Sequence, residues 1–282
     1  MKPAPFAYAK ARSVEDAVRL LNEHGDNAKL LAGGQSLMAT LNMRLSQPAI
    51  LIDLNGIPGL DGIALNGGDV AIGALVRHAT AAKSDVIARH VPLIAMAMPH
   101  IGHPAIRNRG TIGGSIAFAD PAAELPACFL ALNGEAEITG KNGTRRVTAD
   151  DFFRGLYETA IAADEMLTAI RLPSATPDMR YGFAELSRRH GDYALVGLAA
   201  VARADGAGLK DVRLAYFGVG LTPVRATVAE AALIRGSIDD AVEALDYDMA
   251  PPDDVQETGP VKRHLAGVLL RRVAAQMMGG GA

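Results

Sequence analysis

Hydrophobic and polar residues follow two different periods along the first part of the chain. A helical period begins after Ser13, a residue type that suits the N-cap position. The apolar positions of this predicted helix are Val14, Ala17, Val18 and Leu21. Short apolar runs at Lys29–Ala32 and Ala49–Leu54 predict buried strands. Between them, Ser36 predicts the N-cap of a second helix that continues through Leu45.

The middle of the chain predicts a mixture of short strands and helices. Strands are predicted at Val70–Gly73 and Glu165–Leu172. A β-hairpin is predicted between residues 135 and 148, because Asn142-Gly143 tolerates positive φ at a tight turn. The helical stretches are predicted near Thr80–Arg89, Pro92–Met98 and Ala122–Leu132.

The last third of the chain predicts a sheet followed by helices. Ser174–Pro177 is small, polar and proline-containing, which is typical of a linker. Beyond it, an antiparallel meander is predicted from strands Tyr181–Arg188, Leu195–Ala204 and Leu209–Gly218. The closing helices are predicted near Arg225–Ile234, after the N-cap Ser237, and from Pro260 to about Met277. The glycine-rich end, Gly279–Ala282, is expected to fray.

This order of elements indicates the α+β class, in three units. We expect the first unit to span residues 1–55, the second 56–176 and the third 177–282. The length of 282 residues allows two or three compact domains at roughly 100–200 residues each. Because 49% of the residues are hydrophobic and 21% are charged, a large core is expected and extensive disorder is excluded.

Charge and cysteine content exclude several classes of protein. A net charge of −3 gives no general attraction for nucleic acid or for an anionic membrane. No apolar run approaches the length of about 18 residues that would span a bilayer. Met1–Pro5 has no signal-peptide character, so a cytoplasmic location is expected. The single cysteine, Cys128, cannot form an internal disulfide, a cysteine-rich zinc site or an iron–sulfur cluster.

Two glycine-rich segments carry the strongest chemical signal. Leu31–Leu37 contains the pair Gly33-Gly34, and Gly110–Ile116 contains the pair Gly113-Gly114. Glycine pairs tolerate positive φ and turn successive N–H groups to one side, which makes a nest for phosphate oxygens. A diphosphate would suit two such loops, although each pair alone is also compatible with an ordinary tight turn.

Other signatures of known sites are missing from the sequence. There is no Gly-x-Gly-x-x-Gly motif, no P-loop, and no Gly-x-Ser-x-Gly context around Ser36 or Ser115. His100 and His103 have the spacing of metal ligands but no third ligand nearby, so no metal site is predicted. Cys128 lies on an apolar helical stretch, where a buried and inert thiol is expected.

Together, the two glycine segments resemble those of the flavin-binding medium subunit of molybdenum hydroxylases, the family of carbon monoxide dehydrogenase and xanthine dehydrogenase. The resemblance covers nearly the whole chain. Its motifs are Ala32–Leu37, Ile106–Asn108, Thr111–Ser115, Ala119–Pro121 with Glu124, Glu165–Leu167, Arg188 with Gly191–Ala194, and Arg263–Ala266. The resemblance implies an FAD-binding part in two subdomains, of the vanillyl-alcohol oxidase type, followed by a C-terminal α+β flavoprotein domain.

The resemblance also implies which residues hold FAD. The FAD diphosphate is expected to bind the backbone N–H groups of the two glycine segments. The residues concerned are Ala32, Gly33, Gly34, Gln35, Ser36, Thr111, Gly114 and Ser115. No catalytic base or nucleophile is expected from this chain.

Four further positions match the family's contacts to the rest of FAD. Ile101 corresponds to an apolar residue against the isoalloxazine, and Leu167 to a backbone contact with the ring or the adenine side. Glu124 corresponds to an acidic residue near the nucleotide end, and Tyr193 to an aromatic side chain that approaches the flavin ring. Purely structural roles stay open: core packing for the first two, helix capping for Glu124 and surface packing for Tyr193.

In this family the substrate is oxidised at a molybdopterin cofactor on a large subunit, and two [2Fe–2S] clusters on a small subunit pass electrons to FAD. The resemblance therefore implies an electron-transfer flavoprotein subunit, with these two subunits as partners in a dimer of heterotrimers. Two alternatives stay open: a stand-alone flavin oxidase, and a nucleotide-binding assembly module without redox activity.

The substrate and the final electron acceptor are not predicted. Gln35, Ser115 and Glu185 depart from residues that are common in the family, and this weakens the case for carbon monoxide. Purines, N-heterocycles, aldehydes and carbon monoxide all stay open as substrates, and oxygen, a quinone, a cytochrome or NAD as acceptor.

Overall fold

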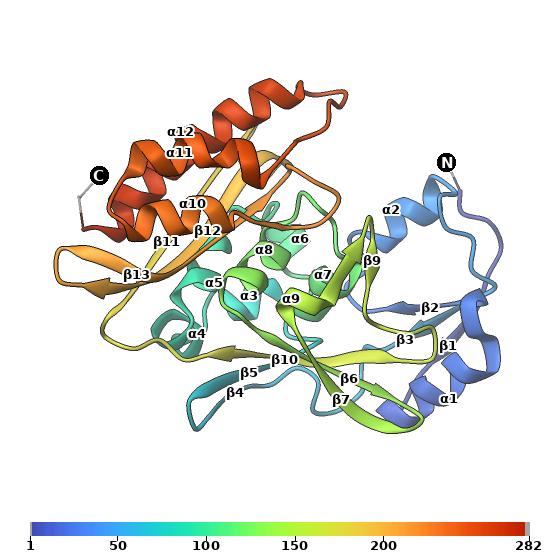
Figure 1. Cartoon of the computed structure of the whole chain (residues 1–282). Coiled ribbons are helices and arrows are strands. Elements are labelled where there is room, and N and C mark those ends of the chain that lie inside the picture. The colour runs from blue at the N-terminus through green and yellow to red at the C-terminus, as the bar shows by residue number, and fades with distance from the viewer. Residues whose placement is uncertain (1, 280–282) are drawn as a thin grey trace.

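Parallel and antiparallel sheets occupy separate parts of the chain, as a computed structural model of residues 2–279 shows (Figure 1). The expected α+β class is confirmed. The C-terminal segment that was expected to fray lies, from residue 280 onward, outside the described residues.

The N-terminal unit is a small parallel sheet with strand order β1-β3-β2 and two helices. Ile50 of the central strand pairs with Ala7 on one side and Ala28 on the other. The first helix forms as predicted, and the Ser13 side chain accepts a hydrogen bond from the N–H of Asp16. The elements are β1 (Ala7–Lys10), α1 (Val14–His24), a 3-10 turn (Gly25–Asn27), β2 (Ala28–Leu31), α2 (Leu37–Asn42) and β3 (Ile50–Asp53).

Two expectations for this unit are wrong. The helix after Ser36 ends at Asn42 rather than Leu45, because Arg44 has a φ of 58° and leaves the helical region. The Ser36 side chain makes no capping hydrogen bond. Strand β1 was not predicted, because its side chains are mostly exposed and give no apolar run.

The core of the N-terminal unit is completed by residues from the next unit. Leu60, Leu75 and Met166 are buried in the same hydrophobic cluster as Val18 and Ile52. Met166 begins β10, the central strand of the second sheet. The two units therefore share apolar packing.

The middle unit is an antiparallel sheet with strand order β4-β5-β10-β6-β7. The predicted hairpin is confirmed as β6 and β7, with Gly143 at a φ of 101°. The helix predicted at Thr80–Arg89 is instead two helices, because Ser84 caps a new helix by accepting from the N–H of Ile87. The sheet strands are β4 (Ile63–Asn66), β5 (Asp69–Gly73), β6 (Glu135–Gly140), β7 (Gly143–Thr148) and β10 (Met166–Pro173).

Short helices cover this sheet (Figure 1). The middle unit also contains a separate two-stranded ribbon. The helix that carries the second glycine pair was not predicted. The helices are α3 (His78–Ala81), α4 (Asp85–His90), α5 (Pro92–Ala97), α6 (Pro104–Arg107), α7 (Ile112–Phe118), α8 (Glu124–Ala131) and α9 (Ala149–Phe152). The ribbon consists of β8 (Phe153–Gly155) and β9 (Glu158–Thr159).

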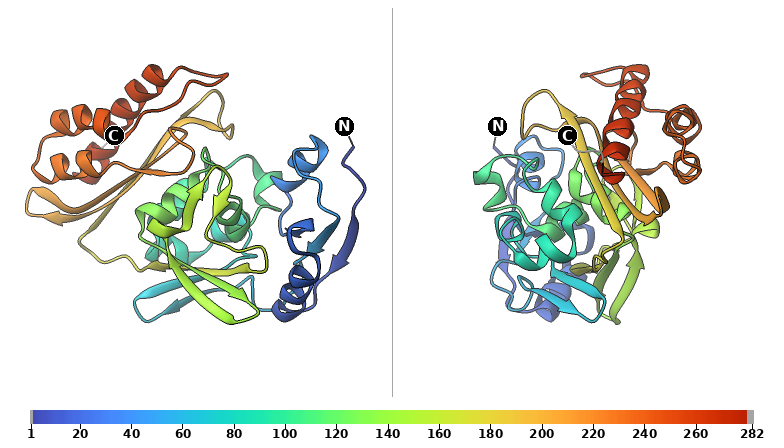
Figure 2. Two further views of the ribbon diagram at one scale, coloured as in Figure 1. Left: turned by 45° about the vertical axis from the view of Figure 1, so that its right-hand side comes forward. Right: turned by 90° about the vertical axis from the view of Figure 1, so that its left-hand side faces the viewer.

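The C-terminal unit is the predicted antiparallel meander, extended by one short strand. Its strands are β11 (Met179–Ser187), β12 (Ala194–Asp205), β13 (Gly208–Phe217) and β14 (Val224–Arg225). Three helices cover its outer face (Figure 2): α10 (Thr227–Ile234), α11 (Ile238–Asp248) and α12 (Gly259–Met277). Ser237 caps α11 by accepting from the N–H of Asp240, as predicted.

The inner face of this meander packs on the middle unit. Phe183 and Phe217 stack with their ring centroids 5.9 Å apart. Both belong to the same buried cluster as Phe129 of α8 and Leu93 of α5. This shared core fixes the loop between β11 and β12 against the helices of the middle unit.

Candidate functional site

The two glycine segments, which lie far apart in the sequence, are in contact in the fold. A Cβ atom added to Gly33 would overlap the carbonyl oxygen of Arg109 and lie 2.9 Å from the Cα of Gly110. A Cβ atom added to Gly114 would lie 3.7 Å from the Cβ of Ala32. The absence of side chains at these glycines therefore allows the two backbones to approach closely.

The first segment has the features of an anion nest. Gly34 has a φ of 74°, in the left-handed region. Among the described residues, the N–H groups of Gly34, Gln35 and Ser36 have no hydrogen-bond partner. The Gln35 side chain donates to the carbonyl oxygen of Gly33 over 3.2 Å, so it braces the turn from outside. Successive free N–H groups of this kind suit a phosphate.

The second segment is built differently from the prediction. Gly113 and Gly114 lie in the first turn of α7, and neither has a positive φ. The side chain of Thr111 caps this helix and accepts from the N–H of Gly114 over 3.0 Å. The N–H groups of Ile112 and Gly113 donate to backbone carbonyls of the neighbouring segment, and that of Ser115 donates to the carbonyl of Thr111. Most N–H groups of the second segment are therefore already used, and the free donors of the two segments lie mainly in the first.

Close packing explains why the second segment needs its glycines. A Cβ atom on Gly113 would lie 2.5 Å from the Cα of Ala74. A Cβ atom on Gly114 would lie 2.6 Å from the Oγ1 of Thr111 and would disturb the helix cap. These glycines bring α7 close to its neighbours, so the segment supports the first loop sterically.

Ile101 and Leu167 are core residues. Their exposed fractions are 8% and 5%, and both belong to the central cluster that includes Ile112 and Ile116 of α7. The carbonyl oxygen of Ile101 accepts from Nη1 of Arg107 over 2.9 Å. The core-packing role that was left open for them is thus present in the fold.

Acidic side chains gather where α8 meets the C-terminal sheet. Glu124 begins α8, and burial raises its pKa to about 7, with a further contribution from the charge of Glu185. Oε1 of Glu185 lies 3.3 Å from Nδ1 of His100, and its other oxygen is buried without a partner. The hydrogen bond with Glu185 raises the pKa of His100. This pair joins two segments that are distant in the sequence, so no local pattern predicted it.

Tyr193 lies on the loop between β11 and β12 with 57% of its surface exposed. Partial burial and the charge of Asp120 raise its pKa, and Glu124 contributes in the same direction. The loop is close to the middle unit, because a Cβ atom on Gly191 would lie 2.6 Å from the carbonyl oxygen of Gly102. Tyr193 thus belongs to the same region as Glu124.

A second tyrosine in this region was missed by the sequence analysis. Tyr157 is 53% exposed, has a φ of 56°, and lies with its ring centroid 5.0 Å from that of Phe118 in α7. Burial raises the pKa of Tyr157, and the charge of Asp120 raises it further. The Tyr157 hydroxyl in turn contributes to the raised pKa of Tyr193. Exposed aromatic residues at a positive φ are uncommon. This backbone conformation is visible only in the structure, so Tyr157 could not be singled out from the sequence.

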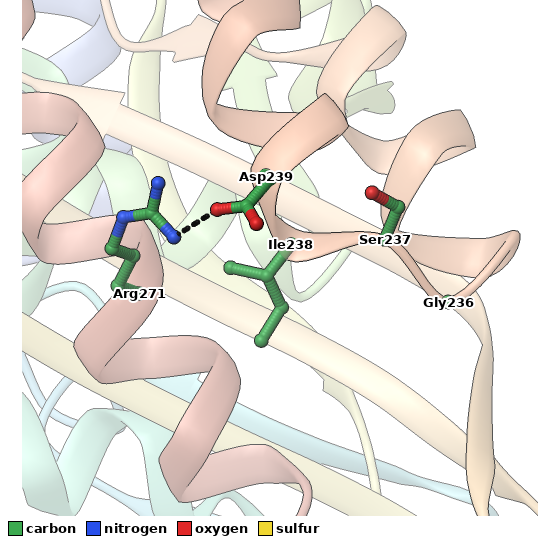
Figure 3. A pocket seen from close by; sticks show the side chains of 5 residues that line it. All are labelled: Gly236, Ser237, Ile238, Asp239 and Arg271. Atoms are coloured by element: carbon green, nitrogen blue, oxygen red, sulfur yellow. Dashed lines mark hydrogen bonds and ion pairs between the residues drawn. The ribbon is translucent and has the colours of Figure 1, made fainter.

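One surface hollow lies away from this region. A surface hollow in the C-terminal unit lies between the start of α11 and α12 (Figure 3). It is lined by Gly236, Ser237, Ile238, Asp239 and Arg271, none of which was predicted as a site residue. Within residues 2–279, no group of three or more metal-ligating side chains is present. No helix in that range is long and apolar enough to span a membrane.

Comparison with known proteins identifies the family of both parts of the chain. Residues 4–175 match the family described as the FAD binding domain in molybdopterin dehydrogenase. Residues 181–277 match the C-terminal domain of the carbon monoxide dehydrogenase flavoprotein.

Several relatives match over most of their length. The chain is 44% identical to the nicotine 6-hydroxylase medium subunit of Paenarthrobacter nicotinovorans, over 77% of this chain and 76% of that protein. It is 41% identical to subunit alpha of the 6-hydroxypseudooxynicotine dehydrogenase complex of the same organism, over 84% and 81%. The structure superimposes on a chain of carbon monoxide dehydrogenase from Hydrogenophaga pseudoflava with a TM-score of 0.96, 36% identity and full coverage of both chains.

The fold, the contact between the two glycine segments and the matches over both parts of the chain lead to one assignment. This chain belongs to the family of FAD-binding medium subunits of molybdenum hydroxylases, the oxidoreductases related to carbon monoxide dehydrogenase.

Proposed function

We propose that this chain is the electron-transfer subunit of a heterotrimeric molybdenum hydroxylase. In this role it receives electrons from two [2Fe–2S] clusters on a small subunit and passes them to an external acceptor. The substrate is oxidised at a molybdopterin cofactor on a large subunit, and the assembly is a dimer of heterotrimers. The observation that carries the proposal is the contact between the two glycine segments, which leaves free N–H groups beside the close approach.

The residues of the two segments fit the diphosphate of FAD. Gly34, Gln35 and Ser36 offer backbone donors, and the Ser36 hydroxyl is free of a capping role. The wall of this phosphate site is completed by Ala32, Gly33, Thr111, Gly114 and Ser115. FAD supplies the redox chemistry, and the chain holds it, orients it and limits access to it.

We also infer the roles of the remaining four predicted residues. Ile101 and Leu167 form the rigid apolar floor of the flavin region, which suits their burial. Glu124 holds a proton near the nucleotide, and Tyr193 covers the ring from the C-terminal unit. The division into units 1–55, 56–176 and 177–282 places a glycine segment in each of the first two and Tyr193 in the third.

The single cysteine agrees with a complex in which the iron–sulfur clusters lie on a separate subunit. Cys128 is fully buried, and burial raises the pKa of its thiol well above the usual value. Iron–sulfur clusters require several thiolates, so the clusters of the proposed complex must lie on another chain.

Two measurements test the proposal. The chain expressed alone should bind about one FAD without a covalent bond, so acid precipitation should release the yellow cofactor. Purified from its native host, it should carry a molybdenum-containing and an iron–sulfur subunit. A chain free of flavin, or one that oxidises an organic substrate without partners, would overturn the proposal.

A further inference from the structure

Two polar side chains connect the glycine segments directly. Nδ2 of Asn55 donates to the carbonyl oxygen of Ala32 over 2.8 Å. The Oδ1 of Asn55 accepts from Nη2 of Arg77, and Nη1 of Arg77 donates to the carbonyl oxygen of Arg109. This Asn55–Arg77 bridge therefore runs from the first glycine segment to the residue that precedes the second.

The bridge is anchored to the N-terminal sheet through Asp53. This residue ends β3, and its carboxylate accepts from the hydroxyl of Tyr8 over 2.5 Å. The other oxygen of Asp53 accepts from the backbone N–H and the side chain of Asn55, over 2.8 and 2.6 Å. The Asn55 side chain is thus held in one orientation by three partners, counting Arg77.

The charge of Arg77 is not neutralised by a direct partner. Both of its hydrogen-bond acceptors are uncharged oxygens, and no carboxylate of the described residues lies within ion-pair distance. Desolvation, followed by the positive charge of Arg109, lowers the pKa of Arg77, while Asp53 offsets this only in part. Within residues 2–279 this partly buried guanidinium has no anion beside it, and it lies between two loops whose own donors are neutral N–H groups.

We propose that Asn55 and Arg77 are positioning residues for the diphosphate. The bridge sets the spacing of the two glycine segments, and Arg77 gives the site the positive charge that the neutral loops lack. This inference rests on the proposed function, since it takes a diphosphate as the anion. It assigns a role to side chains outside both glycine motifs.

The proposed role of the Arg77 charge predicts a result that a purely structural tie does not. Loss of a purely structural tie would weaken FAD binding to the same extent at every salt concentration. A cation that attracts the diphosphate should favour FAD over riboflavin, which has no phosphate, and its effect should weaken as salt screens the charge. The salt dependence therefore separates charge from spacing, and riboflavin shows whether the effect acts through the diphosphate.

The test uses the full chain stripped of flavin, with binding followed by the quenching of flavin fluorescence. Arg77→Met should raise the Kd for FAD by about 10- to 100-fold, the range expected for a lost hydrogen-bonding charge, and should remove most of the salt dependence. Its Kd for riboflavin should stay at the wild-type value. Arg77→Lys should restore the salt dependence but only part of the affinity, because lysine keeps the charge and loses the two-pronged geometry.

Asn55→Ala tests the spacing separately. It should weaken FAD binding by about 10-fold and retain the salt dependence, because Arg77 keeps its charge. Arg19→Met is the matched control, since Arg19 forms exposed ion pairs with Asp16 and Glu23 on α1 and should leave binding unchanged.

Two results would overturn the inference without touching the proposed function. One is wild-type FAD affinity in Arg77→Met, and the other is an equal loss of FAD and riboflavin binding in that variant. If the wild-type chain itself bound no FAD, the proposed function would fail instead.

Discussion

Glu124 shows how one side chain at the junction of two units acquires unusual chemistry. Burial raises its pKa to about 7 from an ordinary value of 4.5. The folded chain thus binds this proton more tightly than the unfolded chain does. The resulting contribution to stability is complete below about pH 4.5 and is lost as the pH rises through 7.

We expect Glu124→Gln to stabilise the flavin-free chain at alkaline pH but not at acidic pH. Glutamine mimics the protonated side chain, so the gain in free energy of unfolding should grow to roughly 1–3 kcal/mol near pH 8. Thermal unfolding at several pH values measures this. The control is Glu243→Gln, at an exposed position of α11, which should show no such trend. A pH-independent difference between the wild type and Glu124→Gln would contradict the pKa assignment.

Tyr193 allows a second prediction at this scale. Tyr193→Ala should keep most of the bound FAD, because the glycine segments are untouched. If the ring covers the flavin, its removal should increase flavin fluorescence and change the rate at which an added acceptor reoxidises the reduced flavin. Stopped-flow measurement of the two half-reactions in the assembled complex separates this from substrate oxidation. Unchanged fluorescence and unchanged reoxidation together would return Tyr193 to a surface role.

Single residues could be predicted from the sequence where their role is local. Ser13 and Ser237 cap the helices that follow them, and Cys128 is buried in an apolar helix, as expected. The His100–Glu185 pair could not be predicted, because it depends on packing between segments that are distant in the sequence.

At the level of elements, α7 shows how tertiary contacts override local preference. Glycine disfavours helices, and the pair Gly113-Gly114 therefore indicated a turn. The Thr111 cap and the close approach to Ala74 stabilise the helix instead. The first segment has no such support, and Gly34 adopts the positive φ that glycine favours there.

The contact between the glycine segments predicts the effect of a single methyl group. Gly33→Ala would place a Cβ atom against the carbonyl oxygen of Arg109, so the segments must separate. We expect a loss of roughly 1–3 kcal/mol in stability and a chain that purifies nearly free of flavin. The control is Gly62→Ala, where a Cβ atom meets nothing within 4 Å. FAD content and thermal unfolding of both variants provide the measurement, and full FAD occupancy in Gly33→Ala would show that the segments need not touch.

At the scale of the whole molecule, a network of charges joins the middle and C-terminal units. Arg213 of β13 donates to the Asp150 carboxylate over 2.9 Å and to the carbonyl oxygen of Leu130 over 2.9 Å. Arg225 reaches the same carboxylate at 3.5 Å and pairs with the buried Glu230 at 2.6 Å. Glu230 also accepts from a backbone N–H of β13, that of Leu214, so both of its oxygens accept hydrogen bonds.

Removing the two acids of this network should have unequal effects. Glu230→Ala leaves the largely buried Arg225 guanidinium with only the Asp150 carboxylate at 3.5 Å and leaves a buried backbone N–H without a partner, and should cost roughly 3–5 kcal/mol. Asp150→Ala removes a carboxylate that is 49% exposed and should cost about 1 kcal/mol or less. Chemical denaturation of the two variants provides the comparison. Equal losses would show that burial does not control the strength of this network.

The overall architecture could be predicted further than the contacts between its parts. The meander, the hairpin and the closing helices follow from local apolar patterns and turn residues such as Gly143. Strand β1 could not be predicted, because it gains its place only by pairing with β3. The Asn55–Arg77 bridge could not be predicted for the same reason, since it joins residues that are distant in the sequence.

The burial of Met166 and Leu75 in the N-terminal core has an evolutionary consequence. A gene fragment that encoded only the first 55 residues would yield a sheet whose core lacks part of its apolar filling. Recombination between related oxidoreductases would therefore disrupt this core when the crossover falls between β3 and β10. The inner face of the C-terminal meander shares a second core with the middle unit, so the three units are inherited together as one block.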